Sequence, residues 1–237
     1  MIEEYTAETY PSFGKKYNGE KAIISLTSWK ARINTVSKTL FSLIKQCPGF
    51  HIVLVLSEEE FPKMMDELPD NLKLFVDNEF IEVLWVYKNY KAFKKWAFTS
   101  DKYRDVPIIS ADDDCIYTSN YAQMLYDKWL KLKKPQCSIR WSNWHNNLHI
   151  PSGPTNLYFG LSKYAYPLIK SLSQKTIQKS EDDIIVGNFI KKLRIKCFYL
   201  SNNSDKPFIF HTEIAAIHKE LKHNKNFKRY YINVSDK

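Results

Sequence analysis

Apolar runs alternate with amphipathic segments along the first half of the chain. The run "KAIISLT" at 21–27 is apolar and β-branched, which predicts a buried strand, and the apolar spacing over 35–46 predicts a helix. The pattern continues with strands expected at 51–57, 80–87 and 106–110, an acidic helix start at 58–68, and helices at 92–103 and 119–134. This alternation indicates an α/β fold with a mostly parallel central sheet flanked by helices.

Beyond residue 134 the pattern becomes less regular. We expect a helix over 180–193, a long aromatic and polar loop over 141–158, and strands at 136–141, 157–162, 195–201 and 208–211. These short strands predict a small mixed or antiparallel C-terminal portion. No internal repeat, low-complexity tract or linker interrupts the sequence, so residues 1–237 are expected to form one domain, beginning with a polar leader at 1–20.

Charge and cysteine content narrow the choice of partner and compartment. The formal net charge is +9 and residues 218–237 are markedly basic, which favours nucleotides, nucleic acid or an anionic membrane as partners. The four cysteines lie far apart without metal-ligand spacing, which is typical of free thiols in a reducing cytosol. No apolar stretch is typical of a signal peptide or a spanning helix, so the expected location is cytoplasmic, free or peripheral on the membrane.

Three adjacent aspartates, Asp112, Asp113 and Asp114, follow directly after the strand expected at 106–110. In open α/β sheets, ligands bind at the carboxyl ends of the strands, and the hydrophobicity of this strand indicates a central position. In an extended segment Asp112 and Asp114 share a face and can bind one Mg²⁺ or Mn²⁺ ion, while Asp113 points to the opposite face. The alternative is a solvated acidic turn. An EF-hand does not fit, because its glycine and later glutamate are missing.

The aspartate cluster and several other segments resemble the nucleotide-sugar glycosyltransferases of the GT-A fold, in which a DxD motif ends a strand. The segment "IISLTSWKARINTVSKTLFSLIKQ" (23–46) is similar to the opening of bacterial polysaccharide glycosyltransferases, and 60–69 and 89–96 continue the resemblance in the same order. The resemblance covers residues 22–212. It implies a Rossmann-like sheet with a nucleotide-binding half at 21–134 and an acceptor and catalytic half at 135–212.

The resemblance also implies a reaction. It is the metal-dependent, inverting transfer of a sugar from a nucleotide-sugar, with a UDP-sugar as the expected donor, to a glycan or lipid-linked acceptor. Such enzymes build bacterial capsule, lipopolysaccharide or other surface polysaccharide. Composition leaves two other functions open: a nucleic-acid-binding module, and a sugar-phosphate nucleotidyltransferase. The second normally needs a glycine-rich phosphate loop, and "LTSWKARI" supplies none.

By resemblance, one group of side chains binds the nucleotide, the phosphates and the sugar of the donor: Thr27, Ser28, Arg32, Lys94 or Lys95, and Asp113. An arginine suits this place because its guanidinium can bind a diphosphate or stack on a base. Structural alternatives remain for these residues. Arg32 can be a surface residue at the start of the next helix, and the two lysines can belong to a solvated face.

The second acidic centre is "SEDDIIVG" at 180–187, which resembles a signature at a helix start in inverting GT-A enzymes such as the fringe and β-1,3-galactosyltransferase group. There a carboxylate acts as general base toward the acceptor hydroxyl. Alignment to Gly187 favours Asp183 as the base, with Asp182 as the rival. The alternative is structural, with Ser180 as N-cap and the acidic residues complementing the helix dipole. In that case the retaining outcome becomes possible.

The remaining candidates lie near the end of the chain and in the long loop. By resemblance, His211 completes the metal site beside Asp112 and Asp114, and neutral imidazole is a suitable Mn²⁺ ligand. The loop at 140–162 is expected to build the sugar and acceptor pocket, with its aromatic side chains as stacking candidates. The basic tail at 213–237 is either a solvated helical end or a peripheral anchor on an anionic membrane.

Overall fold

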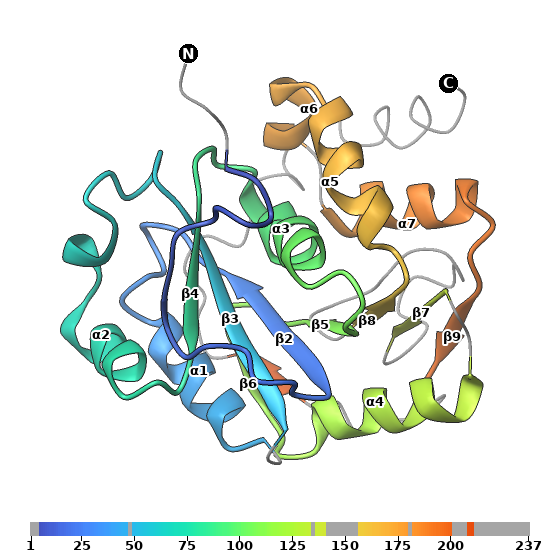
Figure 1. The fold of residues 1–237 in the computed structure, drawn as a ribbon, viewed down its shortest axis with the longest axis horizontal. Helices are drawn as coiled ribbons and strands as arrows, with labels where there is room; N and C mark the ends of the chain where they lie inside the picture. The colour runs from blue at the N-terminus through green and yellow to red at the C-terminus, as the bar shows by residue number, and fades with distance from the viewer. Residues whose placement is uncertain are drawn as a thin grey trace.

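The computed structural model describes residues 5–46, 49–133, 136–140, 156–179, 182–200 and 208–210. In this part of the chain, eight strands form one sheet in the order β1-β4-β3-β2-β5-β8-β7-β9 (Figure 1). Their bounds are Ser12–Gly14 (β1), Ala22–Thr27 (β2), Phe50–Ser57 (β3), Glu82–Val86 (β4), Ile108–Ser110 (β5), Cys137–Arg140 (β7), Asn156–Phe159 (β8) and Cys197–Tyr199 (β9). The strands Cys115–Tyr117 (β6) and Phe208–Phe210 (β10) pair with each other in a smaller sheet.

Strand directions confirm the expected α/β fold. The neighbours β4, β3, β2 and β5 are parallel. Beyond β5 the sheet becomes mixed. There β8 is antiparallel to β5 and to β7, and β9 is parallel to β7. The polar leader expected at 1–20 contributes β1, a strand that the sequence did not predict, and β1 pairs antiparallel with β4 at the sheet edge. Three residues are too short a stretch for periodicity to reveal.

Helices cover both faces of the sheet. They are α1 (Val36–Ile44), α2 (Asp70–Asp77), α3 (Lys94–Lys102), α4 (Tyr121–Leu132), α5 (Ser162–Ser171), α6 (Gln174–Lys179) and α7 (Asp182–Lys192). Side chains alternate across each strand, so Ile24 packs with α1, α2 and α4, whereas its neighbour Ile23 packs with α3, α5 and α7. The result is a layered α/β/α arrangement (Figure 1). Each side of the sheet has its own hydrophobic core.

The helix start expected at 58–68 is wrong. That segment contains only a 3-10 turn at Met64–Glu67, and the α-helix α2 begins afterwards at Asp70. Proline explains the difference, because the residue before a proline is disfavoured in helical conformation. Leu68 is extended with ψ 144°, and Pro69 then precedes the first turn of α2.

The order of the strands creates a switch point between β2 and β5. From β2 the chain builds outward through β3 and β4, and it then returns to place β5 on the other side of β2. Crevices at such points, beyond the carboxyl ends of the strands, are where α/β sheets bind ligands. Segments 28–35, after β2, and 111–114, after β5, therefore flank the expected site.

Two further expectations concern cysteines and membrane spans. Cys115, Cys137 and Cys197 are free thiols in the described part of the chain, in agreement with the expectation from their spacing. Across the described ranges, no helix combines the length and the apolarity that crossing a bilayer requires.

Candidate functional site

Arg32 joins the two sides of the switch point. It follows β2, and its Nη1 atom lies 2.6 Å from Oδ1 of Asp113 and 3.1 Å from Oδ2 of Asp114, which both follow β5. The three side chains are almost completely buried. Ion pairs of this kind gain strength where water is excluded, provided that hydrogen bonds satisfy the charged groups. Arg32 is therefore part of the site interior and not a surface residue at a helix start.

Hydrogen bonds hold the aspartate turn from both sides. Ser28 donates its hydroxyl to Oδ2 of Asp113 at 2.7 Å, and Thr39 of α1 donates to the backbone carbonyl of Asp113 at 3.0 Å. The backbone N–H of Asp112 donates to the hydroxyl oxygen of Tyr117 at 2.7 Å. These bonds fix the backbone of the turn, so the carboxylates are directed by the surrounding elements and not by solvent.

The aspartates do not form the extended segment that the sequence predicted. Asp113 and Asp114 lie in a turn between β5 and β6. Both carboxylates reach the same guanidinium, whereas Asp112 is turned toward α3 and keeps 31% of its side chain exposed. A turn changes the side-chain direction because it breaks the two-residue alternation of a strand. Asp113 consequently shares a partner with Asp114 and does not point to the opposite face.

Lys95 joins the aspartate turn to the start of α7. Its Nζ atom lies 2.6 Å from Oδ1 of Asp112 and 3.4 Å from Oδ2 of Asp182. Burial by itself would lower the pKa of Lys95, but the charges of Asp112, Asp182 and Asp183 outweigh burial and raise that pKa well above its usual value. The two acidic centres of the sequence, 68 residues apart from Asp114 to Asp182, thus meet around one ammonium group.

Lys94 and Thr27 were also expected to bind the donor, but their polar groups contact other parts of the protein. The Nζ atom of Lys94 lies 2.9 Å from Oε2 of Glu60 and 2.9 Å from Oδ1 of Asn89, and its side chain is 1% exposed. Burial lowers the pKa of Lys94, with the charge of Glu60 opposing the shift. Thr27 donates its hydroxyl to the backbone carbonyl of Val55 in β3 at 2.6 Å.

Asp114 is a buried carboxyl group that lies next to other carboxylates. Burial, together with the charge of Asp112, raises the pKa of the Asp114 carboxyl to about 6, even though Arg32 acts in the opposite direction. Among the described residues, the ion pairs of the site join four carboxylates (Asp112, Asp113, Asp114, Asp182) to two cations (Arg32, Lys95). Asp183 also acts on Lys95, so carboxylates outnumber cations at the site, and a bound cation would relieve their mutual repulsion.

The donor set fits a hard cation in part. Mg²⁺ is commonly bound through one or two carboxylates, with substrate phosphates and waters completing the shell, and Asp112 and Asp114 can supply two such carboxylates. Within the described ranges, no group of three or more His, Cys, Asp or Glu side chains is arranged to hold a metal ion. His211, the third ligand expected from the sequence, lies outside the described residues, as do Ser180, the loop at 141–155 and the tail at 213–237.

Sequence reasoning missed several residues that position the site. Thr39 had a recognisable signal, because it is a polar residue on the buried face of α1 beside Val36, Leu40 and Leu43. Tyr117 had none, and Glu60 opens the segment 60–69 of the resemblance but was not singled out in it. Tyr117 belongs to the short strand β6, and Glu60 lies in the segment that was expected to begin a helix. Their roles depend on contacts between segments that are distant in the sequence.

When the chain is compared with known proteins, the similar ones are found among solved structures. No protein-family model matches the sequence, and no curated protein matches it either. The chain is similar to the glycosyltransferase GlyE of Streptococcus pneumoniae, with a TM-score of 0.47 and 13% identity over 77% of this chain and 45% of GlyE. TarS of S. aureus aligns with a TM-score of 0.46 and 13% identity over 81% of this chain and 60% of TarS. The chain thus spans about half the length of the structures it matches.

Proposed function

We propose that the chain is a metal-dependent glycosyltransferase that moves a sugar from a nucleotide-sugar, with UDP-sugar as the leading donor, to a glycan or lipid-linked acceptor. The observation that carries the proposal is the double ion pair of Lys95. It brings the turn at 112–114 against the start of α7, beside the switch point where Arg32 enters. Three segments that resemble glycosyltransferase motifs, at 23–46, 108–117 and 180–187, therefore contribute side chains to one place.

Donor binding is assigned to the two buried cations and to Ser28. Arg32 and Lys95 both face the aspartates, so a diphosphate held at the turn meets two positive charges. We assign the phosphate contact to Lys95 and a structural role to Lys94, whose ammonium is enclosed by Glu60 and Asn89. A divalent cation on Asp112 and Asp114 would neutralise the leaving nucleoside diphosphate.

The register of the smaller sheet supports His211 as a further metal ligand. Phe210 is paired with Cys115 across β10 and β6. Cys115 follows Asp114 in the sequence, and Phe210 precedes His211. Because the two strands are antiparallel, the C-terminal end of β10 lies beside the N-terminal end of β6, which directly follows the aspartate turn.

The general base is assigned to Asp183. Asp182 is committed to Lys95 at 3.4 Å, which suits it for positioning the turn against α7. Asp183 lies in the same first turn of α7 and contributes to the field at Lys95, so its charge is close to the reacting region. Deprotonation of the acceptor hydroxyl by Asp183 would let it attack the anomeric carbon from the face opposite the leaving diphosphate, with inversion.

The proposal is tested by donor binding followed by turnover. Addition of UDP with Mn²⁺ should raise the thermal midpoint, because a ligand that binds only the folded state stabilises it. Asp114→Asn should abolish the shift, and Asp105→Asn, at an exposed turn position, should keep it. Release of free UDP or GDP from a panel of nucleotide-sugars then identifies the donor. Stabilisation by a single-stranded oligonucleotide, with none by UDP and Mn²⁺, would show a nucleic-acid-binding module instead.

A further inference from the structure

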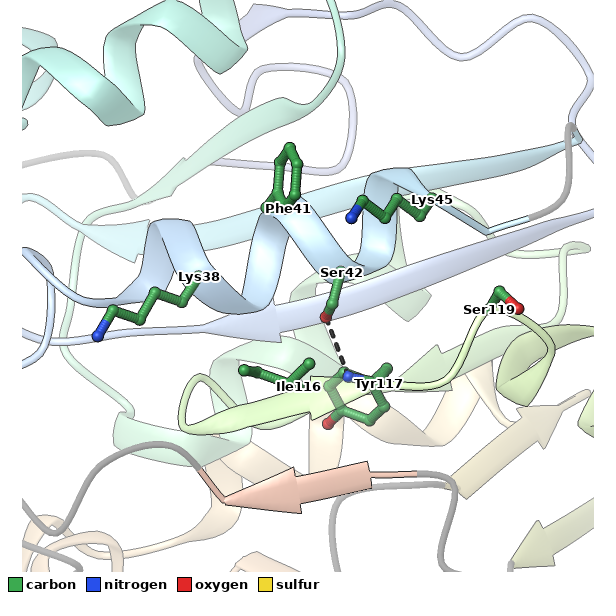
Figure 2. Close-up of a pocket in the computed structure, with 7 residues that line it drawn as sticks. All are labelled: Lys38, Phe41, Ser42, Lys45, Ile116, Tyr117 and Ser119. Carbon is green, nitrogen blue, oxygen red and sulfur yellow. Dashed lines mark hydrogen bonds between the residues drawn. The ribbon is translucent and has the colours of Figure 1, made fainter.

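A pocket of about 330 Å³ lies between α1 and β6, outside the candidate active site (Figure 2). One side of the pocket is formed by Lys38, Phe41, Ser42 and Lys45 of α1 and its C-cap, and the other by Ile116, Tyr117 and Ser119. Most of its lining surface is apolar. The pocket shares Tyr117 with the aspartate turn, but no donor or acceptor contact is assigned to the pocket.

Exposed apolar side chains gather around this pocket. Phe41 is 56% exposed, Ile116 is 36% exposed, and Ile209 of β10 is 66% exposed. Ile209 is the direct cross-strand partner of Ile116, and residues directly opposite each other in an antiparallel pair project to the same side. Large apolar side chains that are exposed together mark a surface that binds a partner. We call Lys38, Phe41, Lys45, Ile116 and Ile209 the α1–β6 surface.

Two lysines give this surface a positive charge. Lys38, Phe41 and Lys45 are spaced by three and four residues, which places them on one face of α1, and both lysines are exposed. The Nζ atom of Lys45 lies 4.1 Å from the centroid of the Phe41 ring. No acidic side chain is among the described residues that line the pocket. An apolar centre with cationic flanks is complementary to an anionic lipid surface, where lysine stems lie along the apolar region and the ammonium groups meet the headgroups.

Other occupants fit less well. A second copy of the chain would bring two surfaces of the same positive charge together, and within the part of the chain that the structure describes no acidic side chain lines the pocket to offset them. An added β-strand would need the open edge of β6, but α1 already occupies that edge. The backbone N–H of Tyr117 donates to Oγ of Ser42 at 3.0 Å, and Nε2 of Gln46 donates to the carbonyl of Thr118 at 2.9 Å.

We propose that the α1–β6 surface docks on an anionic membrane, with Phe41, Ile116 and Ile209 entering the interface and Lys38 and Lys45 binding the headgroups. Docking there would hold the aspartate turn next to the bilayer, because Thr39 of α1 binds Asp113 and β6 begins directly after Asp114. The basic residues 218–237 follow β10 in the sequence and add positive charge to the same chain. The proposal concerns location and does not depend on the reaction.

The test is vesicle sedimentation with the full chain. It should sediment with phosphatidylcholine vesicles that contain phosphatidylglycerol, should stay in solution with phosphatidylcholine alone, and should be released by high salt. The double variant Phe41→Gln, Lys45→Gln should lower the partition coefficient roughly tenfold, since it removes one apolar and one cationic contact.

The matched control is Leu130→Gln, Lys131→Gln, which removes an exposed apolar residue and an exposed lysine at the C-terminal end of α4, outside the α1–β6 surface. The control should sediment like the unchanged protein, and equal thermal midpoints show that both variants are folded. Three results would overturn the proposal. The first is that the unchanged chain does not bind the vesicles. The second is that the two double variants bind them equally well. The third is that the unchanged chain forms a concentration-dependent dimer, which the Phe41 and Lys45 double variant loses while its vesicle binding stays the same.

Discussion

The Nζ atom of Lys95 lies 2.6 Å from Oδ1 of Asp112, and this ion pair connects α3 to the turn that follows β5. The same ammonium group extends to Asp182 at the start of α7. One lysine thus sets the spacing between the proposed donor site and the proposed catalytic helix. Its removal should affect substrate binding and catalysis more than overall folding.

Substitutions of Lys95 and Lys94 are expected to affect different quantities, UDP binding for Lys95 and the free energy of unfolding for Lys94. Lys95→Met should leave Asp112 and Asp182 without their shared counterion and weaken UDP binding in the presence of Mn²⁺ by about tenfold or more, as expected for loss of a charge-assisted contact. Lys94→Met is the matched comparison, at the adjacent residue. It should cost about 1–3 kcal/mol of unfolding free energy by leaving Glu60 unpaired, with a smaller effect on UDP binding. Titration calorimetry and urea unfolding measure the two effects, and identical behaviour of the two variants would contradict the assigned roles.

Arg32 should not be replaceable by lysine. Its guanidinium reaches Asp113 and Asp114 together, and the shorter, point-like ammonium group of lysine cannot reproduce that geometry. Arg32→Lys is expected to lower UDP affinity with Mn²⁺ by about tenfold and to destabilise the fold by about 1–2 kcal/mol. Exposed Arg104, exchanged for lysine, serves as control and should change neither quantity. Full activity of Arg32→Lys would show that the shared ion pair is dispensable.

Asp183 and Asp182 should differ in kinetic effect. Asp183→Asn is expected to reduce kcat by about 10²- to 10⁴-fold with little change in donor binding, because a general base acts in the chemical step. Asp182→Asn should mainly disturb donor binding, because it releases one carboxylate of the Lys95 bridge. Steady-state kinetics with separate donor and acceptor titrations distinguish the two. The assignment of the base would be reversed if Asp182→Asn produced the larger loss in kcat.

A buried network at the opposite end of the sheet should make stability depend on pH. Glu82 accepts from Lys102 at 2.6 Å, is 2.7 Å from Nε2 of His51, and also binds the hydroxyl of Tyr103. Burial would raise the pKa of Glu82, but His51, Lys102 and Tyr103 outweigh burial and lower it below its usual value. Because the folded-state pKa is the lower one, the stabilisation is present above the unfolded pKa and is lost as the pH falls through the folded one.

Glu82→Gln should therefore be less stable than the unchanged protein by about 1–3 kcal/mol near neutral pH, since it removes the charged partner of Lys102, whose side chain is 20% exposed. The difference should begin to shrink as the pH falls below the unfolded pKa of about 4.3, and it should disappear as the pH falls through the lower pKa of Glu82 in the folded protein. Urea unfolding across pH measures both quantities, with exposed Glu79→Gln as control. A difference that stays constant down to low pH would rule out the proposed origin of the stabilisation.

The sequence determined the α/β frame and the place where the site should lie. The apolar runs at 21–27, 51–57 and 80–87 form β2, β3 and β4, and the segment 35–46, with its helical spacing of apolar residues, forms α1. These elements were predictable because burial gives each a local pattern of apolar residues in the sequence. The position of the aspartates behind a central strand was also visible from hydrophobicity. Short elements such as β1 and β6 were not predictable, since their pairing partners are distant in the sequence.

Only the tertiary structure decided which charged groups meet. Lys94 and Lys95 are adjacent and chemically identical, so the sequence cannot distinguish them. In a helix, neighbouring side chains point about 100° apart, and the packing of α3 on the sheet turns Lys94 toward Glu60 and Lys95 toward Asp112. The turn at Asp113 likewise depends on Ser28, Arg32 and Thr39, which arrive from elsewhere in the chain. Charge pairing was decided by packing because the Coulomb energy depends on distances that only the folded chain sets.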